Sequence, residues 1–357
     1  MATDTVSAEI KIQKTANSRI SEVDFDNLVF GKLMTDHAFV ADYTEGKWEN
    51  FRIEAYDNLV LSPATSAIHY GQSIFEGLKA YKNAQGQVLV FRGDQNAKRI
   101  NASARRMCMP EFPEELFMEA MGKLLDLDRA WVPSAEGCSL YIRPFIFATD
   151  AFLGLRPSET YKFMIICSPV GKYYSRPVKV KIETEYSRAA PGGTGSAKTA
   201  GNYAASMYPA RLAQQQGYDQ LIWTDGKEHA FVEEAGTMNV MFLFDDTLTT
   251  ASIDDTILDG ITRKSVLQLA KELGVKVEER KISVKEVIEA AQNGRLKEAF
   301  GVGTAATIAP IAALGFDGKD YHLPEIGEHS LSKRLFDEME NIKRGRTADT
   351  RGWIQTI

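Results

Sequence analysis

Three cysteines are too few for the disulfide framework of a small secreted protein. Cys108, Cys138 and Cys167 also lack the spacing of metal ligands, so we expect reduced thiols and no metal site. No apolar run approaches the length of a membrane span. The net charge of −6 disfavours binding to nucleic acid, which needs a basic surface. The N-terminal segment has acidic residues and lacks an apolar stretch, so it does not fit a secretory signal. A cytoplasmic protein is therefore expected.

The apolar pattern alternates between helical and extended spacing. Helices are expected over residues 95–107, 114–131 and 262–274, and in a closing amphipathic stretch. The stripe of that stretch, which we expect to face the core, consists of Leu331, Leu335, Phe336, Met339 and Ile342. Strands are expected at residues 140–147, 161–169, 178–185, 220–224, 230–234 and 240–244. Residues 38–82 are expected to form strands with tight turns, and residues 1–25 an irregular arm.

A length of 357 residues with 44% hydrophobic and 25% charged residues is typical of a globular protein with about two domains. The strand pattern breaks between Gly171 and Pro177, where we expect the boundary. This gives an N-terminal domain at residues 1–170, a linker at 171–181 and a C-terminal domain at 182–357. The fold class is therefore mixed α/β (α+β).

One lysine, Lys198, lies among small residues, from Gly192 to Gly201, and Tyr203 follows it closely. Burial among such residues disfavours the charged ammonium form. A neutral lysine amine can form a Schiff base with a carbonyl compound. The segment therefore indicates a reactive lysine, although most lysines are solvated surface residues.

The same segment permits a second interpretation, a phosphate-binding P-loop. Residues 192–199 match the pattern G-x-x-x-x-G-K-[ST] except at Ala197, which should be glycine. Residues 221–225 resemble an apolar strand that ends in a magnesium-binding acid, Asp225. This alternative predicts a nucleotide-binding module that binds magnesium-ATP.

Six co-linear segments resemble the branched-chain amino acid aminotransferases, which are fold-type-IV pyridoxal-phosphate enzymes. The resemblance covers nearly the whole chain, from about Phe30 onward, and favours this family over the P-loop. It implies a smaller N-terminal α/β domain and a larger C-terminal pseudo-barrel domain. The matching segments are residues 75–80, 140–144, 198–203, 234–239, 258–263 and 301–305.

The resemblance implies a catalytic lysine and a set of residues that hold the cofactor, pyridoxal 5'-phosphate. Lys198 is the expected tether and proton carrier. Glu234, rather than its neighbour Glu233, is expected to face the pyridine nitrogen, and Tyr203 the phenolic oxygen. The residues expected at the phosphate end are Arg99, Arg188, Ile261, Thr262 and Thr304. Asp259 departs from the proline that many members carry, which puts the geometry of this loop in doubt.

The resemblance also implies a substrate pocket that accepts leucine, isoleucine and valine as well as glutamate or 2-oxoglutarate. Arg143 is the expected partner of the distal carboxylate, and the backbone amides of Thr304 and Ala305 that of the α-carboxylate. The apolar and aromatic lining is expected from Phe30, Tyr70, Phe75, Tyr141, Leu153, Leu155 and Tyr173. Three of these, Tyr70, Leu153 and Leu155, are expected to act across the interface of a homodimer.

Two further alternatives stay open from the sequence. Another type-IV enzyme, such as a D-amino acid aminotransferase or an aminodeoxychorismate lyase, would share the fold, although Arg143 beside Tyr141 disfavours it. A non-catalytic carrier would bind the cofactor without turnover. The function that the sequence favours is transamination of L-leucine, L-isoleucine and L-valine with 2-oxoglutarate, which gives branched-chain 2-oxo acids and L-glutamate.

Overall fold

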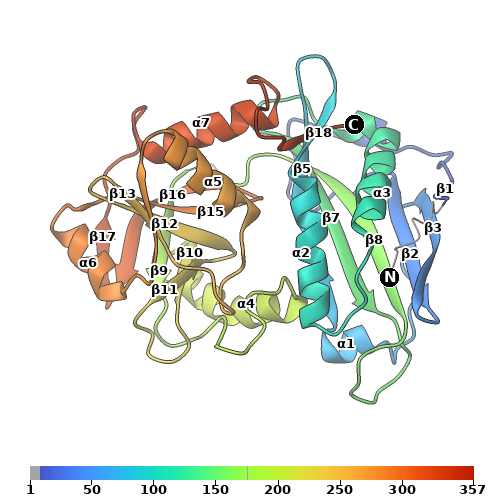
Figure 1. Cartoon of the computed structure of the whole chain (residues 1–357), viewed down its shortest axis with the longest axis horizontal. Coiled ribbons are helices and arrows are strands. Elements are labelled where there is room, and N and C mark those ends of the chain that lie inside the picture. The colour runs from blue at the N-terminus through green and yellow to red at the C-terminus, as the bar shows by residue number, and fades with distance from the viewer. Residues whose placement is uncertain (1–8, 175) are drawn as a thin grey trace. The chain divides into compact units, whose positions relative to one another are not determined.

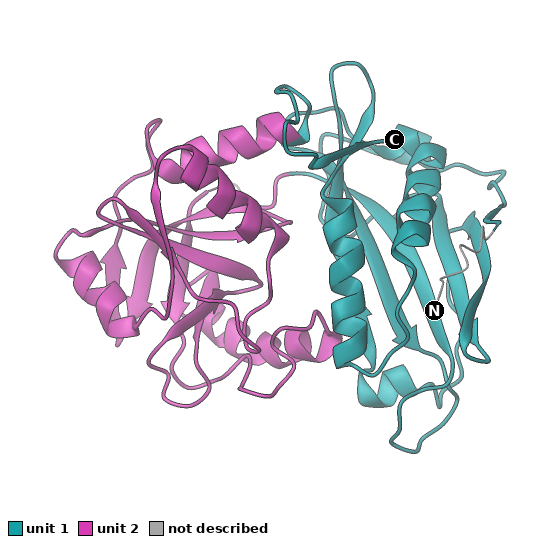
Figure 2. Ribbon diagram, in the orientation of Figure 1, with its two compact units in different colours: residues 1–171, 343–357 teal, residues 172–342 magenta. Residues whose placement is uncertain are grey.

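The chain folds into two compact units, which a computed structural model describes over residues 9–174 and 176–357 (Figure 2). Unit 1 contains residues 1–171 and 343–357, and unit 2 contains residues 172–342. The C-terminal tail therefore packs with the first unit, whereas the sequence placed it in the second domain. Residues 178–181, expected in a linker, are part of a strand. The first eight residues of the expected arm lie outside the described residues.

Unit 1 is built on one nine-stranded sheet that is antiparallel except at β1 (Figure 1). Its strands, in spatial order, are β1 (Lys11–Ile12), β3 (Lys47–Ala55), β2 (His37–Thr44), β8 (Tyr161–Val170), β7 (Ser139–Ala148), β5 (Leu78–Lys82), β6 (Val88–Phe91) and β18 (Ile354–Thr356). The ninth strand, β4 (Ser73–Phe75), pairs with β7 beside β5. The expected strands at residues 140–147 and 161–169 are confirmed as β7 and β8.

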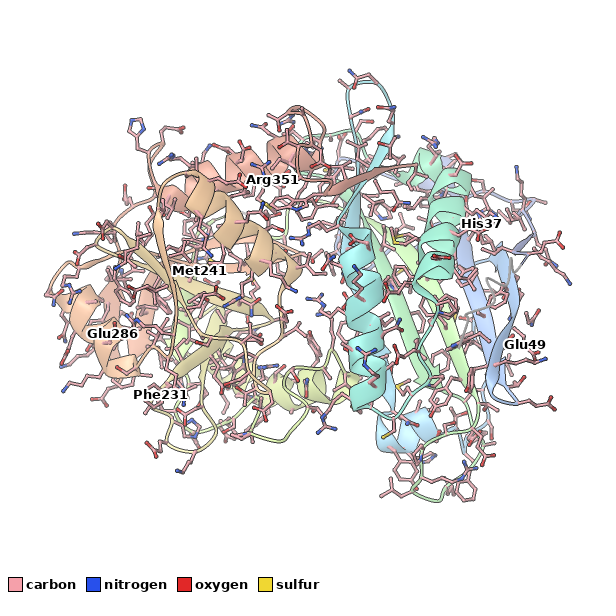
Figure 3. All side chains as sticks on the ribbon, in the orientation of Figure 1. His37, Glu49, Phe231, Met241, Glu286 and Arg351 are labelled. Carbon is pink, nitrogen blue, oxygen red and sulfur yellow. The ribbon has the colours of Figure 1, made fainter. Side chains whose placement is uncertain are left out.

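Two helices, α2 (Gly93–Arg106) and α3 (Glu114–Leu127), cover the sheet of unit 1 and close its core. The helix expected over residues 114–131 ends early and continues as a 3-10 turn, Arg129–Trp131. The reason is Asp128, whose carboxylate accepts the backbone N–H of His37 and lies 2.6 Å from its Nδ1. His37 is buried at the start of β2 (Figure 3). A short helix, α1 (Ser66–Tyr70), also interrupts the expected strands of residues 38–82.

Unit 2 contains a closed barrel of six strands (Figure 1). Around the barrel run β9 (Val178–Ile182), β10 (Gln220–Thr224), β11 (Val232–Ala235), β12 (Met238–Phe244), β15 (Leu296–Gly303) and β16 (Thr307–Phe316). β11 pairs with both β10 and β12, and this closes the ring. Further strands that extend the sheet are β13 (Thr247–Thr250), β14 (Lys276–Glu279) and β17 (Lys319–His322).

Four helices complete unit 2: α4 (Ala200–Gln215), α5 (Ile261–Glu272), α6 (Val284–Gln292) and α7 (Leu331–Lys343). The helix expected at residues 262–274 is confirmed as α5, and Gly274 follows it with a φ of +78°. Such a left-handed residue is a common end of a helix. The stripe of α7 faces the core as expected, since four of its five residues are buried. The mixed α and β fold class is thus confirmed.

Candidate active site

Lys198 and Tyr203 lie in contact where a loop of unit 2 enters α4. The Lys198 Nζ donates to the Tyr203 hydroxyl over 2.7 Å. The loop is held by Asn202, whose side-chain amide donates to the carbonyls of Thr194 and Ala197 over 2.8 and 2.9 Å. The small residues around Lys198 therefore serve to bring a partly buried loop against the helix start rather than to form a surface helix.

A glycine is required in this loop at position 195. A Cβ there would lie 2.5 Å from the Thr256 carbonyl oxygen and 2.6 Å from its Cα. Such distances are far shorter than any van der Waals contact, and the neighbours are backbone atoms that cannot turn away. The glycine run thus permits the close approach of the residue 251–260 loop.

Glu234 is a buried carboxylate on β11, with a side chain that is 5% exposed. Its Oε1 accepts the Leu258 backbone N–H over 3.0 Å and the Asn239 side-chain amide over 3.2 Å. Its Oε2 lies 3.1 Å from the Nε of Arg188, a similarly buried side chain, although the Nε–H is not aligned for a hydrogen bond. These groups all favour the ionised form of the carboxylate.

A pocket lies within unit 2 beside these residues. Its lining includes three residues that the sequence predicted, Arg188, Tyr203 and Glu234. The remaining lining comes from the loop, from α4, from the β11–β12 turn and from Leu258. The structure therefore brings these predicted residues to one cavity.

The N-terminus of α5 lies three residues after Leu258. The first backbone N–H groups of a helix have no partner within the helix, and the helix dipole favours an anion there. Ile261 and Thr262 are the first two residues of α5 and are buried. Gly260 precedes them, and a Cβ there would meet the Asn239 side chain at 1.9 Å. Asp259 forms an ion pair with Lys264 over 2.6 Å, so its charge is partly compensated.

Thr304 and Ala305 lie in the turn between β15 and β16. Because β15 and β12 are antiparallel and Val302 pairs with Asn239, this turn and the β11–β12 turn are at the same end of the barrel. That end also carries Glu234. The contribution of Thr304 and Ala305 to the site stays a prediction.

Four predicted pocket residues form a cluster within unit 1. The guanidinium of Arg143 lies over the Phe75 ring, 4.6 Å from its centroid, and its Nη2 donates to the Tyr141 hydroxyl over 2.9 Å. The ring of Phe30 packs edge-on against that of Tyr141 at 4.9 Å. The Arg143 Nε is buried without a hydrogen-bond partner among the described residues. The cluster is thus apolar with one cation that retains a hydrogen-bond donor.

The other predicted lining residues lie outside this cluster and are exposed, as Phe30 is. The Tyr70 hydroxyl donates to the Leu153 carbonyl, and Leu153 and Leu155 are 60% and 84% exposed. Tyr173 belongs to unit 2 and packs edge-on against Tyr174.

Arg99, predicted at the phosphate end, forms a bidentate ion pair with the fully buried Glu76 in unit 1, with distances of 2.7 and 2.9 Å. This pair fixes the guanidinium on α2. Its role toward a phosphate stays a prediction.

Sequence reasoning missed two residues here. The motif selects Glu234 over Glu233 and gives Glu233 no role, but Glu233 is only 6% exposed. Asn239 was given no role, although it joins Glu234 to the Leu258 carbonyl. Its position could have been inferred, since Glu234 and Asn239 pair across the β11–β12 turn.

Asp225, the magnesium ligand of the P-loop alternative, has a structural role instead. The Asp225 carboxylate accepts the backbone N–H groups of Glu228, Ala230 and Phe231 within its own turn, at 2.8–2.9 Å. It therefore stabilises the β10–β11 hairpin. Among the described residues no group of three or more His, Cys, Asp or Glu side chains could hold a metal ion. In the same part of the chain no helix is long and apolar enough to span a membrane.

Comparison with known proteins agrees with this geometry. The family model described as amino-transferase class IV matches residues 73–314. Branched-chain-amino-acid aminotransferase 2 of Bacillus subtilis is 44% identical over 352 residues, which cover 98% of this chain and 97% of that one. The crystal structure of the Escherichia coli branched-chain amino acid aminotransferase has a TM-score of 0.74 at 27% identity, covering 90% and 98% of the two chains. The Thermobaculum terrenum branched-chain amino acid aminotransferase, solved in its PLP-form, shares the fold with a TM-score of 0.73 at 23% identity, covering 90% and 99%.

The closed barrel with its lysine–tyrosine pair, together with the matched family model, defines a class IV aminotransferase of fold type IV. Within that class, the chain belongs to the family of the branched-chain amino acid aminotransferases, because its similarity to them extends over nearly its full length.

Proposed function

We propose that this protein transfers the amino group of L-leucine, L-isoleucine and L-valine to 2-oxoglutarate, with pyridoxal 5'-phosphate as cofactor. The products are the branched-chain 2-oxo acids and L-glutamate. The observation that carries the proposal is the contact between Lys198 and Tyr203 on the barrel that also holds the buried Glu234. The similarity to branched-chain amino acid aminotransferases over 98% of the chain supports the choice of substrates.

The residues of unit 2 fit this cofactor. A pyridine ring nitrogen needs an anion beside it to remain protonated, and Glu234 is a carboxylate whose ionised form is stabilised by three donors or cations. A phosphate needs free N–H groups, and the start of α5 offers those of Ile261 and Thr262. When bound, pyridoxal phosphate supplies the electron sink for the charge that develops on the substrate Cα.

The side chains of the site divide the remaining work. Lys198 would hold the cofactor through Nζ and would supply the amine that moves a proton at the substrate Cα. Tyr203 would position that amine and would lie toward the phenolic oxygen. Glu234 would keep the ring nitrogen protonated. Ile261, Thr262 and Thr304 would bind the phosphate, and we assign Arg99 and Arg188 to the same group. Arg188 also contacts Glu234.

Substrate recognition combines an apolar pocket with one cation. Arg143 is the partner that we assign to the distal carboxylate of glutamate, while Phe30, Phe75 and Tyr141 pack against the side chain of leucine. The unpartnered Arg143 Nε supports this role, since a carboxylate would satisfy it. The backbone amides of Thr304 and Ala305 take the α-carboxylate, and Tyr173 completes the pocket.

We further propose that the protein is a homodimer whose site is completed by Tyr70, Leu153 and Leu155 of the second copy. Support comes from the exposure of these apolar side chains, because large exposed apolar groups that gather in one region commonly mark an interface. Light scattering should give the mass of a dimer, and replacing both leucines by Asp should give a monomer with impaired turnover. A cytoplasmic location, with no nucleic-acid or membrane partner, is part of the same proposal and is checked by cell fractionation.

The function is tested by the purified protein itself. It should be yellow, and borohydride should fix the cofactor on the peptide that contains Lys198. It should also convert leucine and 2-oxoglutarate to glutamate. A colourless protein that binds magnesium-ATP would favour the P-loop alternative, and a yellow protein without turnover would favour a cofactor carrier.

A further inference from the structure

Two adjacent glutamates on β11 are both buried. Glu233 is 6% exposed and Glu234 is 4% exposed, and a single arginine, Arg188, interacts electrostatically with both. Burial of a carboxylate is costly unless it is paired or protonated. Glu234 has three stabilising neighbours, as described above. Glu233 is different, since its Oε2 is buried and has no hydrogen-bond partner among the described residues.

The other oxygen of Glu233 contacts a threonine hydroxyl that a second acid also contacts. Thr256 Oγ1 lies 2.7 Å from Glu233 Oε1 and 2.8 Å from Asp254 Oδ1. A hydroxyl has only one proton to donate. If both carboxylates were ionised, one of these two contacts would be between lone pairs. The geometry therefore requires a second proton, on one of the two acids.

The surroundings decide which acid carries that proton. Asp254 is exposed to solvent, and it accepts the backbone N–H of Thr256 over 2.9 Å. Glu233 has neither solvent nor a second donor. Burial raises the pKa of Glu233 to about 7, against the smaller opposing effects of Thr256 and Arg188 and with the support of Asp254 and Glu234.

We propose that Glu233 is a positioning residue that works in its protonated form. Its hydroxyl donates to Thr256, and Thr256 donates in turn to Asp254. This series of hydrogen bonds keeps the Thr256 carbonyl in place to accept a hydrogen bond from Arg188 Nη2. Because Glu233 is neutral, Arg188 can pair with Glu234 alone. The inference rests on the proposed function only for the role of Glu234 toward the cofactor.

Loss of the proton would affect the site through these contacts. An ionised Glu233 competes with Glu234 for Arg188 and with Asp254 for the single Thr256 proton. The charged groups that act on Glu233 are Arg188 from the loop after β9, Asp254 from the loop after β13, and Glu234 on its own strand. Above neutral pH we therefore expect Glu234 to stabilise the ring nitrogen less well.

The first test uses the cofactor-free protein, so that it does not depend on the activity. The infrared band of a protonated carboxylic acid should be present in the wild type at about pH 6, should disappear with a midpoint near pH 7, and should be missing in Glu233→Gln. Glu298→Gln is the matched control. Glu298 is equally buried but accepts the N–H groups of Leu331 and Ser332 as a carboxylate, so this change should leave the band in place.

Thermal stability gives a second readout on the same protein. Because the folded-state pKa is raised above the usual 4.5, the folded protein binds the proton more tightly than the unfolded chain. The wild type should therefore lose Tm relative to Glu233→Gln as the pH rises from about 4.5 to about 7, with no further relative change above that. A pH-independent difference in Tm would overturn the proposal.

The last test concerns the loaded enzyme. Glutamine mimics the protonated acid. In the wild type we expect kcat to fall about threefold to tenfold at alkaline pH, when Glu233 loses its proton, and Glu233→Gln should remove this fall. Asp254→Asn takes away a charge that raises the pKa of Glu233, so it should move the infrared midpoint to lower pH. An alkaline fall that persists in Glu233→Gln, or a midpoint unmoved in Asp254→Asn, would contradict the proposal. If there is no transamination at all, the infrared and Tm results still decide it.

Discussion

In the proposed mechanism Lys198 would combine two tasks that usually require two residues, since it would both bind the cofactor and move the proton. The short contact with Tyr203 places its amine before any substrate arrives. Lys198→Ala removes tether and base together, so kcat should fall by at least about a thousandfold. Steady-state assays of leucine with 2-oxoglutarate give the value. Lys285→Ala is the control, because Lys285 pairs with Glu289 on the exposed side of α6, and this variant should retain nearly full activity.

Glu234 should matter more for turnover than for cofactor affinity. Gln keeps the size of the side chain but cannot hold a proton on the ring nitrogen, so we expect kcat to fall about a hundredfold in Glu234→Gln. The dissociation constant of the cofactor, measured by absorbance titration, should change much less. Wild-type kcat in this variant would disprove the electron-sink role and direct attention to Glu233.

At the scale of elements, β7 supports the proposal that one pocket accepts both leucine and glutamate. Tyr141 and Arg143 are two residues apart on this strand and therefore share a face. β4 pairs with β7 and brings Phe75 beneath the guanidinium. The strand thus presents an apolar surface and a cation to the same space.

Arg143→Met should separate the two substrates. A buried carboxylate without its cation costs several kcal/mol, whereas a leucine side chain needs no cation. We expect the half-reaction with glutamate to lose about 2–4 kcal/mol, or about 30- to 1000-fold in kcat/KM, and that with leucine to change little. Single-turnover absorbance of each half-reaction measures this. Equal losses would mean that Arg143 supports the strand or binds the α-carboxylate.

The local sequence pattern predicted helices and strands better than it predicted the burial and contacts of single side chains. Periodicity located α2, α5, β7 and β8, because each has one buried face or is buried throughout. It failed for Glu233, because every residue of β11 is buried and alternation therefore carries no information on that strand. The roles of Lys198 and Glu234 could be inferred from motifs, whereas the contact of Glu233 with Thr256 depends on a loop distant in sequence.

At the scale of the molecule, the tail of the chain is part of the first unit. β18 is only three residues long and pairs with β6, which no local pattern could predict. Beside it Trp353 is buried, packs against the Phe91 ring and lies under two arginines, Arg92 and Arg351. The tail therefore closes one edge of the sheet.

Trp353→Ala should destabilise the protein by about 3–5 kcal/mol, as expected for a large buried aromatic side chain. Equilibrium denaturation in urea measures the loss. Ile12→Ala at the opposite edge of the sheet is the control, since Ile12 is 46% exposed and its removal should cost no more than about 0.5 kcal/mol. A loss below about 1 kcal/mol in Trp353→Ala would show that the tail contributes little to the stability of unit 1.

The order of the chain gives this tail a further significance during protein synthesis. The ribosome makes β6 early and β18 only after the whole barrel of unit 2. Until then the outer edge of β6 exposes unpaired backbone groups, which is the feature through which sheets of separate nascent chains associate. Unit 2, by contrast, is one continuous segment and has all its strands as soon as it leaves the tunnel. The unit made first is thus the one that must wait longest for its last strand, and the period of greatest risk for aggregation is set by the length of the barrel segment.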